Sequence, residues 1–189
     1  MDPIFFLIAS VVITIVVSAV CSLMEASLYA APLSYVKSLD DKGLRSGRIL
    51  LKFKEDMGKP ISAILILNTI SNTGGAAIAG WAASRVFNQT WVVVFSILLV
   101  LAILYISEIF PKTLGVTYCK KIIRFIALPL SFLVYFLSPL VVLTEYFLEV
   151  LILMIKALKF LKKRSFLLHH LELKLVVSSI LRDRLLLMY

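Results

Sequence analysis

The residues best suited to binding a cation come at the end of a long apolar run. Residues 91–106 include no charged side chain, and Glu108 follows two residues later. A charged side chain at membrane depth costs about 2.5–3.5 kcal/mol on insertion scales, so such a group normally faces protein or a water-filled cavity. Pro111 removes a helical hydrogen bond and disfavours the α conformation of Phe110, which predicts a helix break just past Glu108 with free carbonyls. A carboxylate beside free carbonyls can bind a hard cation, and Lys112 marks the expected aqueous edge.

A second group of oxygen donors lies in the apolar segment 61–84. Asn68 and Asn72 are four residues apart and therefore share one helix face, and Gly74 and Gly75 follow them closely. Two interpretations stay open. The amides can join neighbouring helices through hydrogen bonds, or they can belong to a broken segment that coordinates a ligand. The paired glycines favour the second interpretation.

Polar residues also recur along the first apolar run. Thr14, Ser18, Ser22 and Glu25 follow one another at spacings of four, four and three, which places them on one helix face. A hydroxyl in a membrane helix is often bonded only to the carbonyl four residues back, so a structural role stays open. A polar stripe that ends in an acid also fits an ion pathway.

The composition places the chain among membrane proteins. It has 189 residues, of which 61% are hydrophobic, and its mean hydropathy is +1.00. The net charge is +9, but the cations flank apolar runs and form no aromatic-interleaved basic surface, so we expect no nucleic-acid partner. Cys21 and Cys119 have no metal-binding spacing. No nucleophile–base pair or Gly-rich phosphate loop stands out in the sequence, so we expect no enzyme.

These patterns predict an all-α integral membrane protein with three transmembrane helices, over residues 4–24, 61–84 and 91–110. The excess of cations in residues 33–60 makes that loop cytoplasmic and places the N-terminus outside. The apolar spacing of the same loop predicts short amphipathic helices on the membrane surface, separated at Gly43 and Gly47.

Residues 125–155 pose a topological conflict. They are apolar but too few for two further spans of about 20 residues each, and a single span would place the following cations outside. We therefore expect either a non-spanning helical hairpin or juxtamembrane belt helices along the inner interface, bent at Pro129 and Pro139, and not a complete four-span bundle. Glu145 and Glu149 come late in this belt, and we assign them a mainly structural role.

Three motifs resemble a known family. Residues 107–115, Ser-Glu-Ile-Phe-Pro-Lys-Thr-Leu-Gly, resemble the E-x-x-P-K-x-x-G signature of the transmembrane domain (DUF21) shared by CorC and the cyclin-M-like CNNM proteins. Residues 22–28 are similar to that family's first-helix S-x-x-E-x-A-L motif. Residues 67–72 are similar to its second-helix G-N-x-x-x-N motif, except that Leu67 stands in the glycine position. The resemblance covers residues 1–160, roughly the whole membrane domain.

The resemblance implies a fold and a function. It implies three spans, a juxtamembrane belt, a homodimer in the plasma membrane, and magnesium export coupled to sodium, with Mg²⁺ near Ser22, Asn68 and Glu108. Family members usually continue into nucleotide-binding domains, which are absent here, so residues 161–189 are expected to begin a cytoplasmic linker helix. Gly75 and Ala79 have the spacing of small residues at helix contacts, and we expect them in the dimer interface.

The residues and the resemblance together give a predicted site. The predicted metal ligands are Ser22, Asn68, Asn72 and Glu108. The predicted ion pathway adds Ser18, Glu25, Ser71, Gly74, Gly75, Pro111 and Lys112. Oxygen donors suit Mg²⁺, Ca²⁺ or Na⁺, whereas a set without Cys or His does not suit Zn²⁺. Two alternatives to magnesium transport stay open: a non-transporting module that senses Mg²⁺, and export of another cation such as a polyamine.

Overall fold

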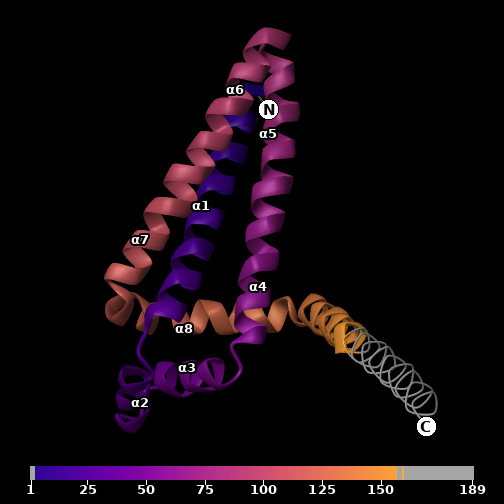
Figure 1. Cartoon of the computed structure of the whole chain (residues 1–189). Helices are drawn as coiled ribbons and strands as arrows, with labels where there is room; N and C mark the ends of the chain where they lie inside the picture. Colours follow the sequence, from indigo (N-terminus) through magenta and orange to yellow (C-terminus); the bar gives the residue numbers. More distant parts are fainter. Residues whose placement is uncertain (1–2, 157–158, 160–189) are drawn as a thin grey trace, which may run out of the picture. The chain divides into compact units, whose positions relative to one another are not determined.

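The computed structural model describes residues 3–156 and 159, and every regular element in that part of the chain is a helix. α1 spans Pro3–Ala30 without interruption. The second long helix consists of α4 (Gly58–Thr69), the π-helical segment η1 (Ile70–Gly74) and α5 (Gly75–Val86). The third consists of α6 (Gln89–Ala102), the π-helical segment η2 (Ile103–Ile109) and α7 (Phe110–Thr117). Figure 1 shows α1 between the other two long helices, and it contacts both.

These three helices are long and apolar enough to cross a membrane. They have 28, 29 and 29 residues, so each extends about 42 Å at 1.5 Å per residue, beyond a hydrocarbon core of about 30 Å. The three predicted apolar helices are confirmed, and each is longer than its predicted range. The turn between the second and third is tight, and the side-chain oxygen of Asn88 caps α6 by accepting a hydrogen bond from the Trp91 N–H at 3.2 Å.

A fourth helix, Ser138–Lys156, is also long and apolar enough to span a membrane, judged by length and composition alone. The described residues thus contain four candidate spans, where the sequence predicted three. Pro139 lies in the first turn of this helix, where a missing N–H costs little, so it opens a helix there. From Leu143 onward the chain belongs to a second compact unit. The predicted linker helix, residues 161–189, lies outside the described residues.

Two short helices follow α1. α2 spans Leu33–Asp41 and α3 spans Arg45–Glu55, which confirms the predicted amphipathic pair. Gly43 separates them and has a φ of 71°, a conformation that glycine adopts at low cost. Gly47 does not separate helices, because it lies inside α3 and is buried. A Cβ there would overlap the backbone of α2 at Asp40, so Gly47 permits the close approach of the two helices.

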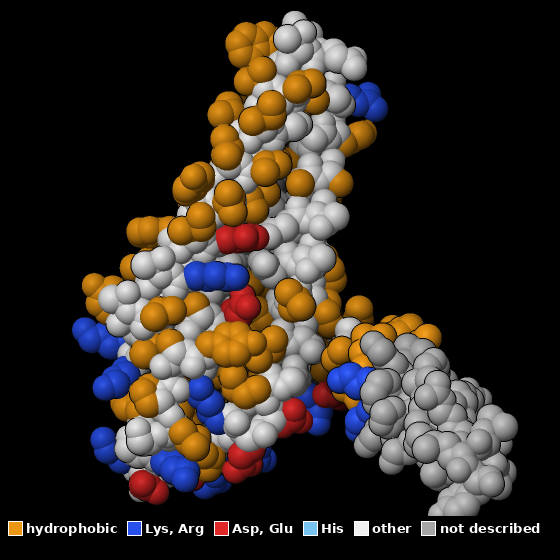
Figure 2. Space-filling model, viewed as in Figure 1, with side chains coloured by type: hydrophobic (Ala, Val, Ile, Leu, Met, Phe, Trp, Pro, Cys, Tyr) orange, Lys and Arg blue, Asp and Glu red, His pale blue; other side chains and the backbone are white. Residues whose placement is uncertain are grey.

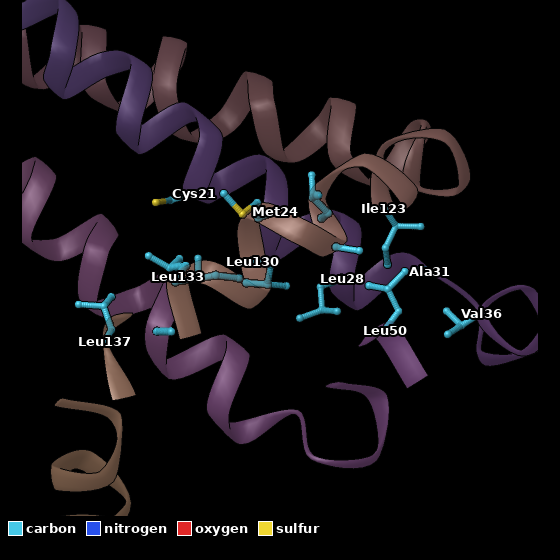
Figure 3. Packing of buried hydrophobic residues seen from close by; sticks show 14 of the residues in the cluster. Cys21, Met24, Leu28, Ala31, Val36, Leu50, Ile123, Leu130, Leu133 and Leu137 are labelled. Atoms are coloured by element: carbon cyan, nitrogen blue, oxygen red, sulfur yellow. The ribbon is translucent and has the colours of Figure 1, made fainter. Parts of the chain in front are cut away.

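α8, Cys119–Phe136, packs against α1, α3 and α4, and Figure 1 shows it running across α1 and α4. Figure 3 shows the shared core, in which Leu28 of α1, Leu50 of α3 and Leu130 of α8 are fully buried. The opposite face of α8 is exposed and aromatic, with Phe132 71% exposed. An amphipathic helix of this kind, with Pro129 inside it, fits the predicted belt for the first part of residues 125–155.

A lysine joins this core to the end of α1. Lys54 of α3 donates a hydrogen bond from Nζ to the carbonyl oxygen of Leu28 at 2.6 Å. Leu28 is in the last turn of α1, where carbonyl groups lack helical partners and a cation is favourable. Partial burial lowers the pKa of Lys54, and the neighbouring Cys119 opposes that shift. This hydrogen bond therefore joins α3 to the last turn of α1.

Candidate functional site

Side chains from all three long helices meet midway along α1. Ser18 of α1 donates a hydrogen bond from Oγ to Oδ1 of Asn68 in α4, at 2.9 Å. Asn72 of η1 donates from Nδ2 to Oε1 of Glu108 in η2, at 2.9 Å. Ser22 lies one turn beyond Ser18 and is fully buried. The structure thus brings the predicted metal ligands onto the facing sides of the three helices.

Two oxygen atoms in this cluster are buried without a partner. Neither Oγ of Ser22 nor Oδ1 of Asn72 has a hydrogen bond to any described group. A buried polar atom left unpaired costs about 1–3 kcal/mol, so most such atoms in folded proteins have partners. The two atoms come from different helices, and both belong to residues that sequence analysis predicted as metal ligands. Each oxygen can therefore accept a hydrogen bond or ligate a cation without giving up a hydrogen bond that it already accepts.

The two π-helical segments both lie at this cluster. Asn72 is in η1, and Ser107 and Glu108 are in η2. In η2 the N–H of Phe110 donates to the carbonyl of Tyr105, five residues earlier. Such a one-residue shift widens the helix and is common at functional sites. The Asn72–Glu108 hydrogen bond thus joins one π-helical segment to the other.

The predicted helix break past Glu108 is wrong. Phe110 has φ −64° and ψ −49°, which is α-helical, and the helix continues to Thr117. Pro111 is buried at the start of α7, directly after the π-helical segment. The wider hydrogen-bond spacing of η2 accommodates the missing proline N–H, so a π-bulge takes the place of a break. The predicted break near Gly74 is likewise a π-helical segment in a continuous helix.

Several predicted pathway residues also make structural contacts. Oγ of Ser71 donates to the Thr14 carbonyl at 3.2 Å and so ties η1 to α1. A Cβ on Gly75 would overlap the Thr14 side chain, so Gly75 lets α5 approach α1. Ala79 is completely buried in the same protomer. Within one chain, Gly75 and Ala79 thus pack against α1, and their place in a dimer interface stays a prediction. Gly74 is different, since a Cβ there would contact nothing within 4 Å.

An ion pair lies one helical turn below the cluster. Nζ of Lys112 is 3.2 Å from Oε2 of Glu25, with the side chains 45% and 28% exposed. Glu25 comes three residues after Ser22, and Lys112 comes four residues after Glu108. The pair therefore joins α7 to α1 on the faces that carry the cluster. Sequence analysis named both residues but missed their pairing, which those two spacings could have indicated.

Below the ion pair the first and third helices are in close contact. A Cβ on Gly115 would lie 2.9 Å from the Cβ of Ala26 and 2.9 Å from the carbonyl oxygen of Leu23. Oγ of Ser27 also donates to the Gly115 carbonyl at 3.2 Å. This contact fixes α7 against α1, and so fixes the position of the Lys112–Glu25 pair.

The donor set has a clear chemical character. The cluster offers hydroxyl and amide oxygens and one carboxylate. Among the described residues, no group of three or more His, Cys, Asp or Glu side chains could hold a metal ion. Cys21 is buried in the core and Cys119 is unpaired with another cysteine. The arrangement can therefore bind a hard cation only by combining neutral oxygens with Glu108.

Comparisons with known proteins agree with the three motifs. Residues 8–184 match the family described as CNNM: Cyclin M transmembrane N-terminal domain. The chain is similar to the UPF0053 protein sll1254 of Synechocystis sp., with 37% identity over 74% of this chain and 40% of the relative. It is also similar to a UPF0053 protein of Haemophilus influenzae, with 30% identity over 77% of this chain and 34% of the relative. A DUF21 domain-containing chloroplastic protein of Arabidopsis thaliana is 27% identical over 65% of this chain and 18% of that protein. The chain thus spans less than half the length of these relatives.

Proposed function

This chain belongs to the cyclin M transmembrane domain family and is an integral membrane protein, and from these premises we propose that it exports Mg²⁺ across the membrane in exchange for Na⁺. One observation carries the proposal. Asn72 has a buried side-chain oxygen without a partner, and its amide nitrogen is hydrogen-bonded to the Glu108 carboxylate. A cation bound beside Glu108 would give the Asn72 oxygen a partner, and Ser22 supplies a second unpartnered buried oxygen, one turn beyond Ser18 on α1.

The donor set supports a small hard cation. Ser22, Asn68, Asn72 and Glu108 supply oxygen only, and Mg²⁺ prefers oxygen ligands. Mg²⁺ also demands near-octahedral geometry and loses water reluctantly, so backbone carbonyls or retained water would complete its shell. A single carboxylate leaves net positive charge on a bound divalent ion. This incomplete neutralisation of the ion's charge suits a transporter, because the ion must be able to leave the site again.

The Glu25–Lys112 pair serves as the cytoplasmic gate in this proposal. An ion that moves between the cluster and the cytoplasm along α1 passes the Lys112 ammonium, which repels it at short range. When a cation approaches Glu25, it competes with Lys112 for the carboxylate. The ion pair therefore opens as the ion passes and closes again behind it.

The proposed topology follows from charge. Over the face seen in Figure 2, charged side chains concentrate around α2 and α3, while hydrophobic side chains dominate toward the α5–α6 turn. The cationic loop lies in the cytoplasm, and the N-terminus and the α5–α6 turn lie outside the plasma membrane. We assign three crossings and an interfacial position to the Ser138–Lys156 helix, because a fourth crossing would carry Lys156 and the cations after it outside. We also propose a homodimer.

Ion flux in liposomes tests the function directly. Purified protein is reconstituted with a Mg²⁺-sensitive dye inside the vesicles, and a Na⁺ gradient is applied. We expect Mg²⁺ movement that depends on the gradient and is absent in Glu108→Gln. Mg²⁺ binding without flux would instead identify a sensing module, and flux of spermidine that Mg²⁺ does not inhibit would identify polyamine export. Either result would overturn the proposal.

A further inference from the structure

A groove runs between α1 and the second long helix. Its volume is about 460 Å³. It is lined mainly by apolar side chains of the two helices: Phe6, Ile13, Val17, Leu67, Ile70 and Ile78. Ile13 is 62% exposed and Ile70 is 54% exposed, so the described residues leave large apolar groups uncovered at membrane depth. The groove therefore favours an apolar occupant.

The few hydroxyl groups in the groove are already bonded to backbone. Ser10 donates to the Leu7 carbonyl at 2.8 Å, Thr14 donates to the Ser10 carbonyl at 2.7 Å, and Ser71 donates to the Thr14 carbonyl. The groove wall thus offers no hydroxyl hydrogen that still needs an acceptor. A polar ligand or a column of water would find few partners along it.

The length of the groove matches one membrane leaflet. From Leu67 to Ile78 the second helix advances by 78 − 67 = 11 residues, about 16 Å at 1.5 Å per residue. Half of a hydrocarbon core of about 30 Å is nearly the same length. A single extended acyl chain therefore fits the groove along its axis.

A second, smaller cavity of about 260 Å³ continues the groove toward the α5–α6 turn. It shares Phe6 with the groove and is also lined by Trp81 and Arg85. The guanidinium carbon of Arg85 lies 5.3 Å from the centre of the Trp81 ring, and Phe6 meets the same ring edge-on at 6.0 Å. Arg85 forms no ion pair with another residue in the described part of the chain.

Arg85 is placed where a lipid headgroup would lie. It comes seven residues after Ile78, about 10 Å farther along the helix. Tryptophan and arginine commonly mark the level of the headgroups, and the guanidinium fork binds phosphate oxygens in pairs. The apolar groove is thus followed, about 10 Å farther toward the α5–α6 turn, by an exposed cation.

We propose that this crevice binds one anionic phospholipid, with an acyl chain in the groove and the phosphate on Arg85. The lipid packs against η1, which turns Ile70 and Gly74 toward the groove while Asn72 of the same segment contacts Glu108. Lipid in the groove therefore supports the segment that carries one wall of the polar cluster. The proposal stands independently of which cation, if any, the cluster transports.

Native mass spectrometry of the purified protein tests the proposal. The protein in mild detergent is titrated with phosphatidylglycerol or with phosphatidylcholine of the same acyl chains. We expect one tightly bound lipid per chain, with a preference for phosphatidylglycerol. In Arg85→Gln we expect that preference to fall about tenfold, because the variant loses one charge-assisted hydrogen bond to the phosphate. Equal retention of the two lipids by the parent protein would overturn the headgroup assignment.

A matched pair of glycines tests the acyl groove. Neither Gly74 nor Gly80 would bring a Cβ within 4 Å of another group, but only Gly74 lines the groove. We expect Gly74→Leu to lose the bound lipid and Gly80→Leu to retain it, with neither variant melting below the parent. Lipid retention in Gly74→Leu overturns the proposal. A change of oligomeric mass in Gly74→Leu alone also overturns it, because the groove would then be an interface between copies of the chain.

Discussion

The two π-helical segments hold the same polar cluster in different ways. η2 buries Ile103 and Ser107, whereas η1 has no buried residue. η2 is also followed by the close contact of Gly115 with α1 and by the Lys112–Glu25 ion pair. η1 instead borders the open groove on its other side.

This difference assigns separate roles to the two walls of the site. Local stability follows the number of buried contacts, so a segment with few of them opens at a lower free-energy cost. The carboxylate of Glu108 comes from the well-packed wall, and the amide of Asn72 comes from the less packed wall. We therefore expect the fixed wall to supply the charge that binds the ion, and the η1 wall to move when the ion enters or leaves.

The largest effect is expected from Glu108→Gln, which keeps the side-chain size and removes the charge of the fixed wall. We expect Mg²⁺ binding by calorimetry to weaken by about 100-fold or more, because no other carboxylate is hydrogen-bonded into the cluster. Glu145→Gln is the matched control and should bind Mg²⁺ nearly as the parent does. If Glu108→Gln bound Mg²⁺ as tightly as the parent, the site would lie elsewhere.

Adding one methyl group to each wall should give opposite signs of stability change. In Gly115→Ala the new Cβ lies 2.9 Å from Ala26 and from the Leu23 carbonyl, so we expect a destabilisation of about 1–3 kcal/mol from overpacking. In Gly74→Ala the new Cβ meets nothing, so we expect a gain of about 0.5–1 kcal/mol from helix propensity. Thermal unfolding in one detergent compares them. Equal shifts for the two variants would contradict the difference between the walls.

The spacing of polar residues in the sequence was enough to identify the helix faces that carry the predicted metal ligands. The face that carries Asn68 and the face that carries Ser18 were both identified by the spacing of polar residues, and the two faces meet in the Ser18–Asn68 hydrogen bond. An acid after a long apolar run identified Glu108 for the same physical reason, since a charge at that depth needs partners.

The π-helical segments could not be predicted in the same way. A shift of one hydrogen bond leaves no mark on residue type, and only packing against α1 shows that the helix continues through Pro111. Gly47 was misassigned for a related reason. A glycine that permits close approach of two helices looks, in sequence, like one that ends a helix.

The ion pair below the cluster should give an intermediate effect. Lys112→Gln removes a cation one turn from the carboxylate that binds the ion, so we expect Mg²⁺ affinity to increase about threefold by relief of repulsion. Lys112→Arg keeps the charge and should bind Mg²⁺ as the parent does. Lys120→Gln, on an exposed part of α8, is the control for loss of one cation. Weaker Mg²⁺ binding in Lys112→Gln would show that the lysine does not act as a gate.

The smallest expected effect concerns the contact that holds α3 to the end of α1. Burial lowers the pKa of Lys54 below its ordinary value of 10.5, so between the two values the unfolded chain binds more protons than the folded chain. The contribution of Lys54 to stability therefore rises as the pH passes upward from the lowered pKa to 10.5, and is constant below that window. Lys54→Met keeps most of the apolar stem and removes the titrating group.

Thermal unfolding at a series of pH values up to 10.5 measures this contribution. We expect the parent to lose less stability than Lys54→Met as the pH approaches 10.5, because only the parent regains the cost of the buried charge. Lys52→Met removes an exposed lysine of the same helix and should follow the parent. At neutral pH, Lys54→Met should also remove the hydrogen bond of 2.6 Å that the Leu28 carbonyl accepts, and so loosen α3 from α1. Mg²⁺ binding at the distant cluster should be unchanged. A parallel pH dependence for all three proteins would show that water, and not the α1 terminus, solvates the Lys54 ammonium.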